Sequence, residues 1–391
     1  MISVDDALSK LLALAPSMTS EAVPLTEADT RVLAAPAQAS RAQPPFAASA
    51  MDGYAVRASD AGVGAELTIA GEAAAGHHWQ GTLAPGTAVR IFTGAPVPAG
   101  ADAILIQENA TRAQDLIRVT EAPAQGAYLR PAGGDFPAGF TLSAPRRLGP
   151  REVALFAAMN VAEVNVSRRP IVALIPTGDE LVLPGEDPGP DQIVTSNNFG
   201  LAAMLSRAGA LPRLCPIARD TRQSLLDALA VAQGADLIVT LGGASVGDHD
   251  LVAEVFEGAG LERAFYKIAM RPGKPLMAGS IGSAMMVGLP GNPVSAMVCG
   301  EIFLRPLIDK MLGLPTGRRQ TARATLLEAT PANGPREHYL RARLHPGHPL
   351  PRIEIFENQD SSRLATLAAA NALAIRPPNA PALHAGAEVD F

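Results

Sequence analysis

The sequence predicts a multidomain protein of the α+β and α/β classes, built around a mostly parallel sheet. Between residues 168 and 316, strand patterns alternate with helix patterns, which is typical of a parallel sheet covered by helices on both faces. Between residues 46 and 139, short alternating runs are separated by clusters of Gly and Pro, which predicts a compact β domain. At about 150 residues per domain, the 391 residues correspond to two or three domains.

Composition excludes several classes of protein. The formal net charge of −6 argues against a general nucleic-acid-binding protein, which needs a basic face. The two cysteines, Cys215 and Cys299, exclude a disulfide-stapled scaffold and a cysteine-rich zinc site, and they suit a reducing compartment. No apolar stretch is long enough to span a membrane, and the N-terminus is acidic before it is apolar, the reverse of a signal peptide. We therefore expect a cytoplasmic protein without nucleic-acid or membrane partners.

The chain opens with a predicted helix. Ser3 can cap it, Asp5 and Asp6 lie in the first turn, where the helix dipole favours negative charge, and Pro16 stops it. Its apolar residues repeat at i, i+3, i+4 and i+7, namely at Leu8, Leu11, Leu12 and Ala15. A helix used for packing or dimerisation explains this pattern.

The predicted β domain is an insertion. Its strand patterns lie at residues 66–71, 87–94, 103–108 and 116–121. Residues 148–166 then return to a helical period, so we expect this segment to rejoin the N-terminal helix.

The second half of the chain divides into an α/β part and a tail. The α/β part has predicted strands at 168–178, 213–218, 236–243, 264–269 and 284–291, and helices at 196–210, 221–235, 248–260 and 293–313. The tail has predicted strands at 322–329, 338–344, 352–357 and 372–377 around one helix at 361–372. Ligands of such parallel sheets bind at the carboxyl ends of the strands, near a topological switch point.

Common nucleotide and hydrolase motifs are absent: the sequence has no P-loop, no G-x-G-x-x-G after a strand, no H-E-x-x-H and no G-x-S-x-G. The most informative segment is 237–250, in which a strand runs into glycines and acids: Gly242, Gly243, Ser245, Gly247 and Asp250. Glycines at a strand end let a ligand approach the backbone, and freed N–H groups can hold an anion. Asp250 could bind a metal or accept from a heterocycle, or Asp248 or Asp250 could simply cap the next helix.

Two further segments are candidates for binding an anion. Lys267, Arg271 and Lys274 surround a Pro-Gly turn and suit an oxyanion or a phosphate, although a solvated charged loop would look the same. Pro290 and Pro293 fix a loop that leads into a helix with free N–H groups, or they serve only as structural punctuation.

A fourth segment, 175–185, carries acids just after a strand. Thr177, Asp179 and Glu180 could hold a hard cation such as Mg²⁺ through oxygen, or they could be solvated or cap a helix. All four segments lie at strand ends of one predicted parallel sheet. Together they suit a phosphate-bearing small molecule and a divalent cation.

Seven motifs in series resemble those of the MoeA family, which comprises molybdopterin molybdenumtransferases and the matching domain of gephyrin. They are SAMDGYAVR (49–57), RIFTGAPVPAGAD (90–102), RPAGGDFPAG (130–139), PTGDELV (176–182), GGASVGDHD (242–250), MRPGKP (270–275) and GLPGNPVS (288–295). The resemblance covers essentially the whole chain. It implies an elongated four-domain subunit with a central molybdopterin-binding α/β domain, an inserted β domain and a C-terminal β-rich domain.

The resemblance also implies the domain limits and the assembly. Domain I would comprise residues 1–45 and 140–167, helical and serving as linker or dimer contact, and domain II residues 46–139. Domain III would be residues 168–316 and domain IV residues 317–391. The family is homodimeric, and its active cleft lies between domains III and IV of one subunit and domain II of the other. Other proteins of molybdenum cofactor biosynthesis are further expected partners.

The implied reaction uses adenylyl-molybdopterin and molybdate, releases AMP and leaves molybdenum on the dithiolene, with the assistance of Mg²⁺. Molybdate is an oxyanion, so it calls for Arg, Lys and hydroxyl donors. The substrate's dithiolene supplies the sulfur, so the protein needs few cysteines.

The resemblance assigns roles residue by residue. In the β domain it implies functional positions at Asp52, Thr93, Asp135 and the basic Arg130. Glu180 would be an essential acid near the metal, with Asp52 and Asp250 as further metal ligands. The remaining substrate-binding positions would be Asp220, Gly242, Gly243, Ser245, Gly247, Asp250, Lys267, Arg271, Lys274, Pro290 and Pro293, with Arg341 and Ser362 at a molybdate site on domain IV.

Two positions depart from the family pattern. Arg271 stands where many members have Lys, which keeps the charge but changes the geometry of any molybdate contact. The segment RPAGGDF lacks the acid that commonly precedes the position of Asp135. A paired carboxylate is therefore not expected there.

Two alternatives explain less of the sequence. A molybdopterin adenylyltransferase or a CinA-like nucleotide hydrolase would account for residues 168–316 but not for the β domain. A non-catalytic scaffold of the gephyrin type predicts loss of Glu180 or of the bases around Lys274, and both are present.

Overall fold

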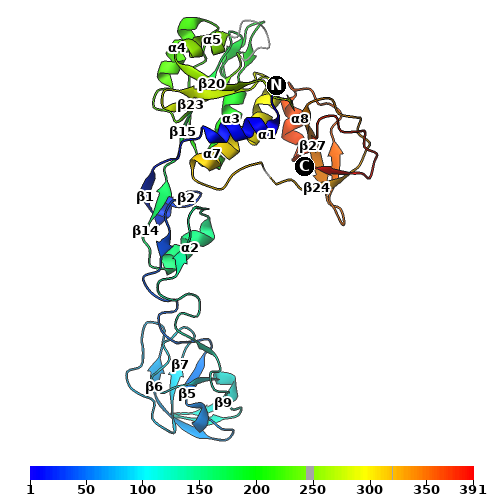
Figure 1. Cartoon of the computed structure of the whole chain (residues 1–391). Coiled ribbons are helices and arrows are strands. Elements are labelled where there is room, and N and C mark those ends of the chain that lie inside the picture. Colours follow the sequence, from blue (N-terminus) through cyan, green and yellow to red (C-terminus); the bar gives the residue numbers. More distant parts are fainter. Residues whose placement is uncertain (244–250, 319) are drawn as a thin grey trace.

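The chain is an elongated molecule of four parts (Figure 1). The computed structural model describes residues 1–243, 251–318 and 320–391. A central α/β part lies beside a C-terminal β part, and a narrow stalk connects the central part to a β domain at the far end (Figure 1). The described residues form three six-stranded sheets, one in each of the larger parts, which confirms the predicted multidomain fold class.

The central part contains a mostly parallel sheet of order β18-β15-β19-β23-β22-β20. Neighbouring strands among β18, β15, β19 and β23 pair in parallel, whereas β22 is antiparallel to both β23 and β20. The strands are β15 (Ile171–Pro176), β18 (Leu211–Leu214), β19 (Leu237–Leu241), β20 (Leu261–Tyr266), β22 (Met277–Ile281) and β23 (Ala284–Leu289). The helices are α1 (Val4–Ala13), α3 (Asn197–Ala208), α4 (Arg222–Val231), α5 (Leu251–Gly258), α6 (Pro293–Cys299) and α7 (Arg305–Met311).

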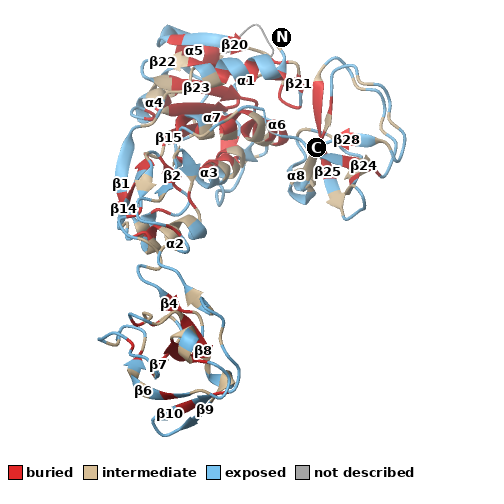
Figure 2. Cartoon of the chain, turned by 60° about the horizontal axis from the view of Figure 1, so that its bottom comes forward, coloured by how far each residue is buried: buried red, intermediate tan, exposed pale blue. Residues whose placement is uncertain are grey.

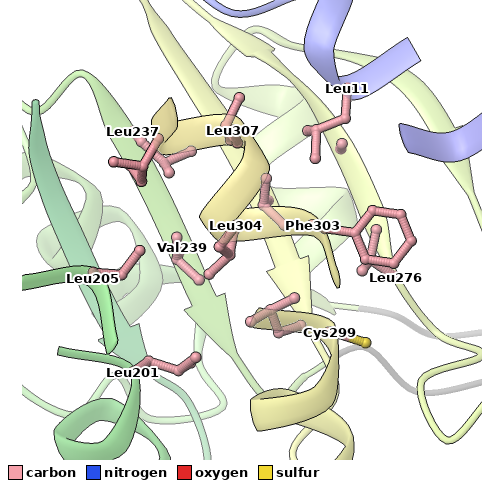
Figure 3. Close-up of a cluster of buried hydrophobic side chains, with 14 of the residues drawn as sticks. Leu11, Leu201, Leu205, Leu237, Val239, Leu276, Cys299, Phe303, Leu304 and Leu307 are labelled. Carbon is pink, nitrogen blue, oxygen red and sulfur yellow. The ribbon is translucent and has the colours of Figure 1, made fainter. Parts of the chain in front are cut away.

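Helices cover both faces of this sheet, as the sequence predicts. Alternate strand residues point to opposite faces: Val172 and Leu174 pack with α1, α3, α6 and α7, whereas Ala173 and Ile175 pack with α4 and α5. The central strands β15, β19 and β23 are accordingly buried almost throughout, whereas the edge strands β18 and β20 are largely exposed or half-buried (Figure 2). Figure 3 shows the larger core, in which Phe303 lies among leucines from several elements.

The predicted single helix over 293–313 is interrupted. Residues Gly300–Leu304 form a π-helical segment, η4, between α6 and α7. Pro306 cannot donate to a carbonyl one turn earlier and its ring crowds that turn, so the helix widens there. Gly300 also lets α3 approach closely, since a Cβ at this position would lie 2.5 Å from Leu201 Cδ2.

The stalk is a small α+β unit, which differs from the helical domain expected. Its sheet has the order β1-β14-β2-β13 and packs against α2. The elements are β1 (Ser20–Pro24), η1 (Leu25–Glu27), β2 (Val32–Leu33), β13 (Arg146–Arg147), α2 (Pro150–Ala158) and β14 (Glu163–Ser167). The prediction of a continuous helical period over 148–166 was wrong beyond Ala158, because the alternating Val164 and Val166 are buried in a strand paired with β1.

Helix α1 does not pack against α2 in the stalk. Ser3 caps it as predicted, accepting from the Asp6 N–H at 3.0 Å. Its buried residues Leu8 and Leu11 belong to the core of the central part instead. The expectation that 148–166 rejoins this helix was therefore wrong.

The far β domain has a sheet of order β8-β5-β7-β6-β10-β9. The strands are β5 (Gly53–Val56), β6 (Glu66–Ala73), β7 (Thr87–Ile91), β8 (Ala103–Ile106), β9 (Ala110–Ala113) and β10 (Leu116–Val119), with turns η2 (Ala58–Asp60) and η3 (Gln107–Asn109). Strand β5 is short and wholly buried, so it lacks the alternation by which β6, β7, β8 and β10 were predicted. Two short two-stranded sheets join this domain to the stalk. One pairs β3 (Ala37–Gln38) with β12 (Thr141–Leu142), and the other pairs β4 (Ala48–Ser49) with β11 (Leu129–Arg130).

The C-terminal part is a sheet of order β21-β25-β26-β24-β28-β27, closed by an additional pairing of β25 with β27. Its elements are β21 (Met270–Arg271), β24 (Arg323–Leu326), β25 (Glu337–His345), β26 (Arg352–Ile355), α8 (Leu364–Ala369), β27 (Ala372–Arg376) and β28 (Glu388–Asp390). Strand β21 comes from the central part and so joins the two. A remaining pair, β16 (Leu181–Val182) with β17 (Ile193–Val194), borders the cavity described below.

Within the described residues, no helix combines the length and apolar character that crossing a membrane requires.

The core of the central part should depend strongly on Phe303. Replacing it with Ala removes a fully buried ring and should lower the free energy of unfolding by about 3–5 kcal/mol. Phe199→Ala is the matched control, because that ring is 42% exposed in the same part of the molecule. Urea unfolding followed by circular dichroism measures both, and equal losses would contradict this account of the core.

Candidate functional site

Loops from the whole sheet meet at one edge. The strands β15, β18, β19, β20 and β23 all run in the same direction, so the segments that follow them lie at the same edge of the sheet. The chain passes from β15 to β18 on one side and returns to β19 on the other. The ends of β15 and β19 therefore flank a topological switch point, where α/β sheets open a crevice.

A cavity of about 580 Å³ occupies this edge. Its lining comes from the segments that follow β15, β18, β19 and β23, from Pro275 and from one residue of the C-terminal part. The lining residues are Thr177, Gly178, Glu180, Leu181, Ile193, Val194, Thr195, Ser196, Asn197, Asp220, Leu241, Gly242, Gly243, Pro275, Pro290, Gly291, Asn292, Pro293 and Ser362. The structure thus brings together Glu180, Asp220, Gly242, Gly243, Pro290, Pro293 and Ser362.

Glycine is required at the end of β19. A Cβ on Gly242 would lie 2.7 Å from the Thr177 carbonyl oxygen, and one on Gly243 would lie 2.2 Å from Val252 Cγ2. Both glycines also have positive φ, at 108° and 66°. The predicted residues Ser245, Gly247 and Asp250 lie outside the described residues.

Three carboxylates gather beside the cavity. The Asp179 carboxylate accepts from the Asp220 N–H at 3.0 Å, which ties the loop after β15 to the loop after β18. Partial desolvation, followed by the carboxylates of Asp179 and Glu180, raises the pKa of Asp220 above its usual range. Glu180 folds back over Gly178, where a Cβ would lie 2.3 Å from its Oε2.

Arg219 holds this acidic group in place, although it was not among the site residues predicted from the sequence. Its Nη1 donates to the carbonyl oxygens of Gly178, Asp179 and Leu181 at 3.2, 2.9 and 3.0 Å. All three acceptors belong to the loop that carries Glu180. The only sequence signal was an arginine directly before Asp220, which has no meaning until the two loops are known to be neighbours.

The donor set fits a hard cation only in part. Mutual repulsion among the carboxylates of Asp179, Glu180 and Asp220 is what a divalent cation relieves, and oxygen ligands suit Mg²⁺. Over the described ranges, however, no group of three or more His, Cys, Asp or Glu is arranged to hold a metal ion. Mg²⁺ characteristically takes one or two carboxylates and completes its shell with water and substrate phosphates. These residues therefore fit a Mg²⁺ that arrives with a phosphate-bearing substrate.

The loop before α6 is used differently from the prediction. The Val294 N–H, expected to be free for an anion, donates to the Ser361 carbonyl oxygen at 3.0 Å. Asn292 Nδ2 also donates to Ser361 Oγ at 3.0 Å, and Asn197 Nδ2 to the Gly291 carbonyl oxygen at 2.7 Å. This loop therefore holds the C-terminal part against the cavity.

The predicted basic residues Lys267, Arg271 and Lys274 are not among the residues that line the cavity. Lys267 Nζ lies 4.7 Å from the centroid of the Tyr266 ring, in a cation–π contact. Arg271 lies on β21 and is paired with β25, whereas the Lys274 carbonyl oxygen accepts from the Ile268 N–H at 3.0 Å. Pro275 is the residue of this loop that lines the cavity.

Arg341 lies directly behind the cavity wall. It is fully buried, and its Nη2 donates to the Asp360 carbonyl oxygen at 3.1 Å, in the loop that carries Ser362. Its Nε and Nη1 have no hydrogen-bond partner among the described residues. A buried guanidinium with two unsatisfied nitrogens fits an oxyanion-binding role.

The remaining predicted residues lie in or near the far β domain. Asp52 Oδ1 accepts from both the backbone N–H and the hydroxyl of Thr93, at 2.7 and 2.8 Å. These hydrogen bonds, with a smaller contribution from Arg90, lower the pKa of Asp52. Arg130 lies on the neighbouring β11, and Asp135 lies in the loop beyond it; both are exposed.

The expected metal ligands Asp52 and Glu180 are therefore not brought together within one chain. The stalk separates the domain of Asp52 from the cavity (Figure 1).

Comparison with known proteins now identifies the family. Three family models match consecutive parts of the chain: the MoeA N-terminal region (domains I and II) at residues 2–160, a probable molybdopterin binding domain at 173–310, and the MoeA C-terminal region (domain IV) at 323–391. A molybdopterin molybdenumtransferase of Nostoc is 35% identical over 100% of this chain and 93% of its own length. Molybdopterin molybdenumtransferase 2 of Mycobacterium tuberculosis is 37% identical over 94% of this chain and 93% of its own length.

This chain belongs to the MoeA family of molybdopterin molybdenumtransferases. A crystal structure of the MoeA protein of Pyrococcus horikoshii matches all of this chain and 98% of that one, with a TM-score of 0.84 and 28% identity. Membership in the MoeA family, expected from the seven motifs, is confirmed. The roles assigned to individual residues and the domain limits stay predictions.

Asp220 should be a destabilising residue in the absence of substrate. Because its pKa is raised in the folded state, the ionised form is disfavoured there, and Asp220→Asn should raise the thermal midpoint at pH 7. This gain should shrink as the pH falls through the raised pKa, since wild-type Asp220 then becomes neutral as well.

Scanning calorimetry at several pH values tests this expectation. Asp227→Asn is the control, because Asp227 is exposed on α4 and accepts a hydrogen bond from Gln223 Nε2 one turn earlier on the same helix. A lower midpoint for Asp220→Asn at pH 7 would show that the carboxylate stabilises the fold.

Proposed function

We propose that this chain inserts molybdenum from molybdate into adenylyl-molybdopterin and releases AMP. The MoeA family to which it belongs acts in molybdenum cofactor biosynthesis. The observation that carries the finer proposal is the cavity at the switch point, where the glycines after β19, three carboxylates and a loop of the C-terminal part meet. We also propose that the protein works in the cytoplasm.

Each part of the cavity suits a part of the substrate. The glycines after β19 leave space for a ligand to approach the backbone, as a pterin or phosphate requires. Asp220 can accept from N–H groups of the pterin, since a carboxylate is an acceptor for such donors. Arg341 supplies guanidinium donors behind Ser362, which suits the molybdate oxyanion.

Cleavage of the adenylyl phosphoanhydride develops negative charge on the departing phosphate. A bound Mg²⁺ would supply electrostatic stabilisation of that charge. Glu180 and Asp220 are the residues of this chain that would hold it, and Arg219 fixes the loop on which Glu180 stands. The chain itself therefore contributes binding and orientation.

We further propose a homodimer with shared active sites. The Asp52–Thr93 pair is preorganised in the far β domain, away from the cavity of its own chain. A second subunit could bring its own pair to this cavity. Closed two-fold symmetry would then build two equivalent sites.

The alternatives are separated by one assay. Purified protein should release AMP from adenylyl-molybdopterin only when molybdate is present, and EDTA should abolish the release. Glu180→Gln should reduce the rate by at least about a hundredfold, because it would weaken the hold on the Mg²⁺ that stabilises the developing negative charge. Chromatographic quantification of AMP measures this.

The controls separate the outcomes. Glu186→Gln is a matched control, because Glu186 is exposed on the same segment and accepts from the Leu183 N–H. Turnover of ATP with free molybdopterin instead would favour an adenylyltransferase. Wild-type rates in Glu180→Gln would refute the assignment of that residue.

Subunit mixing tests the shared site. Asp52→Asn and Glu180→Gln should each be inactive alone, and a refolded equimolar mixture should regain about a quarter of wild-type activity. Half of the dimers would be mixed, and each mixed dimer would contain one intact site and one doubly altered site. A mixture that stays inactive although mass spectrometry shows mixed dimers would place both residues in the site of one chain.

A further inference from the structure

A second cavity, of about 630 Å³, lies where the stalk joins the central part (Figure 1). Ile171 and Leu211, the paired first residues of β15 and β18, supply an apolar wall. Because these strands begin here, the cavity lies at the opposite edge of the sheet from the candidate functional site. Its charged lining residues are Glu21, Glu27, Asp29, Arg31, Arg168 and Arg169.

Two of the three arginines in this lining have partners within the protein. Arg31 Nη2 donates to Glu21 Oε1 and to the Ser167 carbonyl oxygen, the latter at 3.0 Å. Arg168 forms a two-pronged ion pair with Asp236, with Nη1 donating to Oδ2 at 3.0 Å and Nη2 donating to Oδ1 at 2.7 Å. The charges of Arg31 and Arg168 are therefore compensated without a ligand.

Arg169 is the exception. Its side chain is half-buried, and it forms no hydrogen bond or ion pair with any residue that the structure describes. Its Nε is buried without a partner, as is Nε of Arg31, a residue that is only 8% exposed. Withdrawing guanidinium donors from water without replacing their hydrogen bonds costs free energy. The cavity therefore offers an uncompensated cation to an incoming acceptor.

Two acids in the same lining are also unpaired. Glu27 and Asp29 are exposed, and over the described ranges neither side chain forms a hydrogen bond or an ion pair. Once the paired groups are set aside, the lining carries one cation, Arg169, and these two carboxylates. A simple anion would be repelled by the carboxylates, and a simple polyamine would be repelled by Arg169. The complementary molecule has one anionic group and two cationic groups.

We propose that this cavity binds a basic amino acid, a small molecule with one carboxylate and two cationic groups. The carboxylate accepts from the Arg169 guanidinium, whose planar donors match carboxylate geometry. The two cationic groups approach Glu27 and Asp29. The methylene chain lies along the apolar wall of Ile171 and Leu211, as such chains do on apolar surfaces.

The lining comes from both the stalk and the central part, so a bound amino acid would connect the two. Glu27 and Asp29 belong to the stalk, whereas Ile171 and Leu211 belong to the central sheet. The site is independent of the proposed transferase reaction, because it shares no lining residue with the cavity at the switch point.

L-lysine is the probe. Calorimetric titration of the full-length protein at pH 7 should show saturable binding of L-lysine. Arg169→Met should weaken this binding about tenfold to a hundredfold, the usual effect of removing a charged hydrogen bond. Arg146→Met is the matched control, because Arg146 is an exposed arginine of the stalk that does not line the cavity. Absence of saturable binding, or an equal loss in Arg146→Met, would overturn the proposal.

Cadaverine, which is lysine without its carboxylate, tests the role of Arg169 without relying on the folding of the variant. It should bind to wild type at least about tenfold more weakly than L-lysine. In Arg169→Met the two ligands should bind about equally, and cadaverine should bind at least as well as it does to wild type, which also shows that the cavity is intact. If wild type binds both ligands equally, the assignment of the carboxylate to Arg169 is wrong.

L-norleucine, which lacks the side-chain ammonium group, tests the acids. The double variant Glu27→Gln, Asp29→Asn should weaken L-lysine binding about fivefold, the effect of two exposed ion pairs, and should affect L-norleucine less. Glu163→Gln is the control, because Glu163 is exposed on β14 outside the lining. Equal affinity of wild type for L-lysine and L-norleucine would refute the selectivity for a basic amino acid.

Discussion

The site depends on the common direction of the strands in the central sheet. Five strand ends reach one edge there, and the switch in connection between β15 and β19 leaves a crevice between them. At the end of β19 the backbone lies so close to the Thr177 carbonyl oxygen that no side chain fits between them. Glycine is therefore required at position 242. The cavity, its acids and its link to the C-terminal part all follow from that edge, because each is carried by a loop that begins at it.

Among the described residues, the carboxylates at this edge are positioned by hydrogen bonds with the backbone and form no ion pair with a basic side chain. Arg219 donates hydrogen bonds to the carbonyl oxygens of Gly178, Asp179 and Leu181. The Asp179 carboxylate accepts from the Asp220 N–H. The loops are rigidly joined, yet the carboxylates of Glu180 and Asp220 still repel each other. Such unrelieved repulsion is characteristic of sites that gain a compensating charge on binding. The C-terminal part shows the opposite case, with His338 and Arg376 buried among cations.

The sequence could predict what depends on local pattern. The alternation of strands and helices over 168–316 indicated the parallel sheet, and that sheet required the four loops to share an edge. The strand β14 was missed because its valines follow a helix without a break, so both periods fit the segment until pairing with β1 is known. The Val294 N–H, in the helix start that was expected to offer free N–H groups to an anion, is occupied for a different reason: Ser361, which accepts from it, comes from a part of the chain almost 70 residues away. Arg219 acquires meaning only from neighbours that are distant in sequence.

Asp52 and the Glu180 loop are each held by hydrogen bonds within their own part of the chain. Thr93 fixes Asp52 by two hydrogen bonds within the far β domain, and Arg219 fixes the Glu180 loop within the central part. Neither arrangement needs the other in order to form. A reaction that uses both would therefore require only that two preformed surfaces meet, and the cost of organising the catalytic groups would already be met by the folding of each domain. Under the proposed dimer, the stalk determines only the distance between these surfaces, since the geometry within each is set locally.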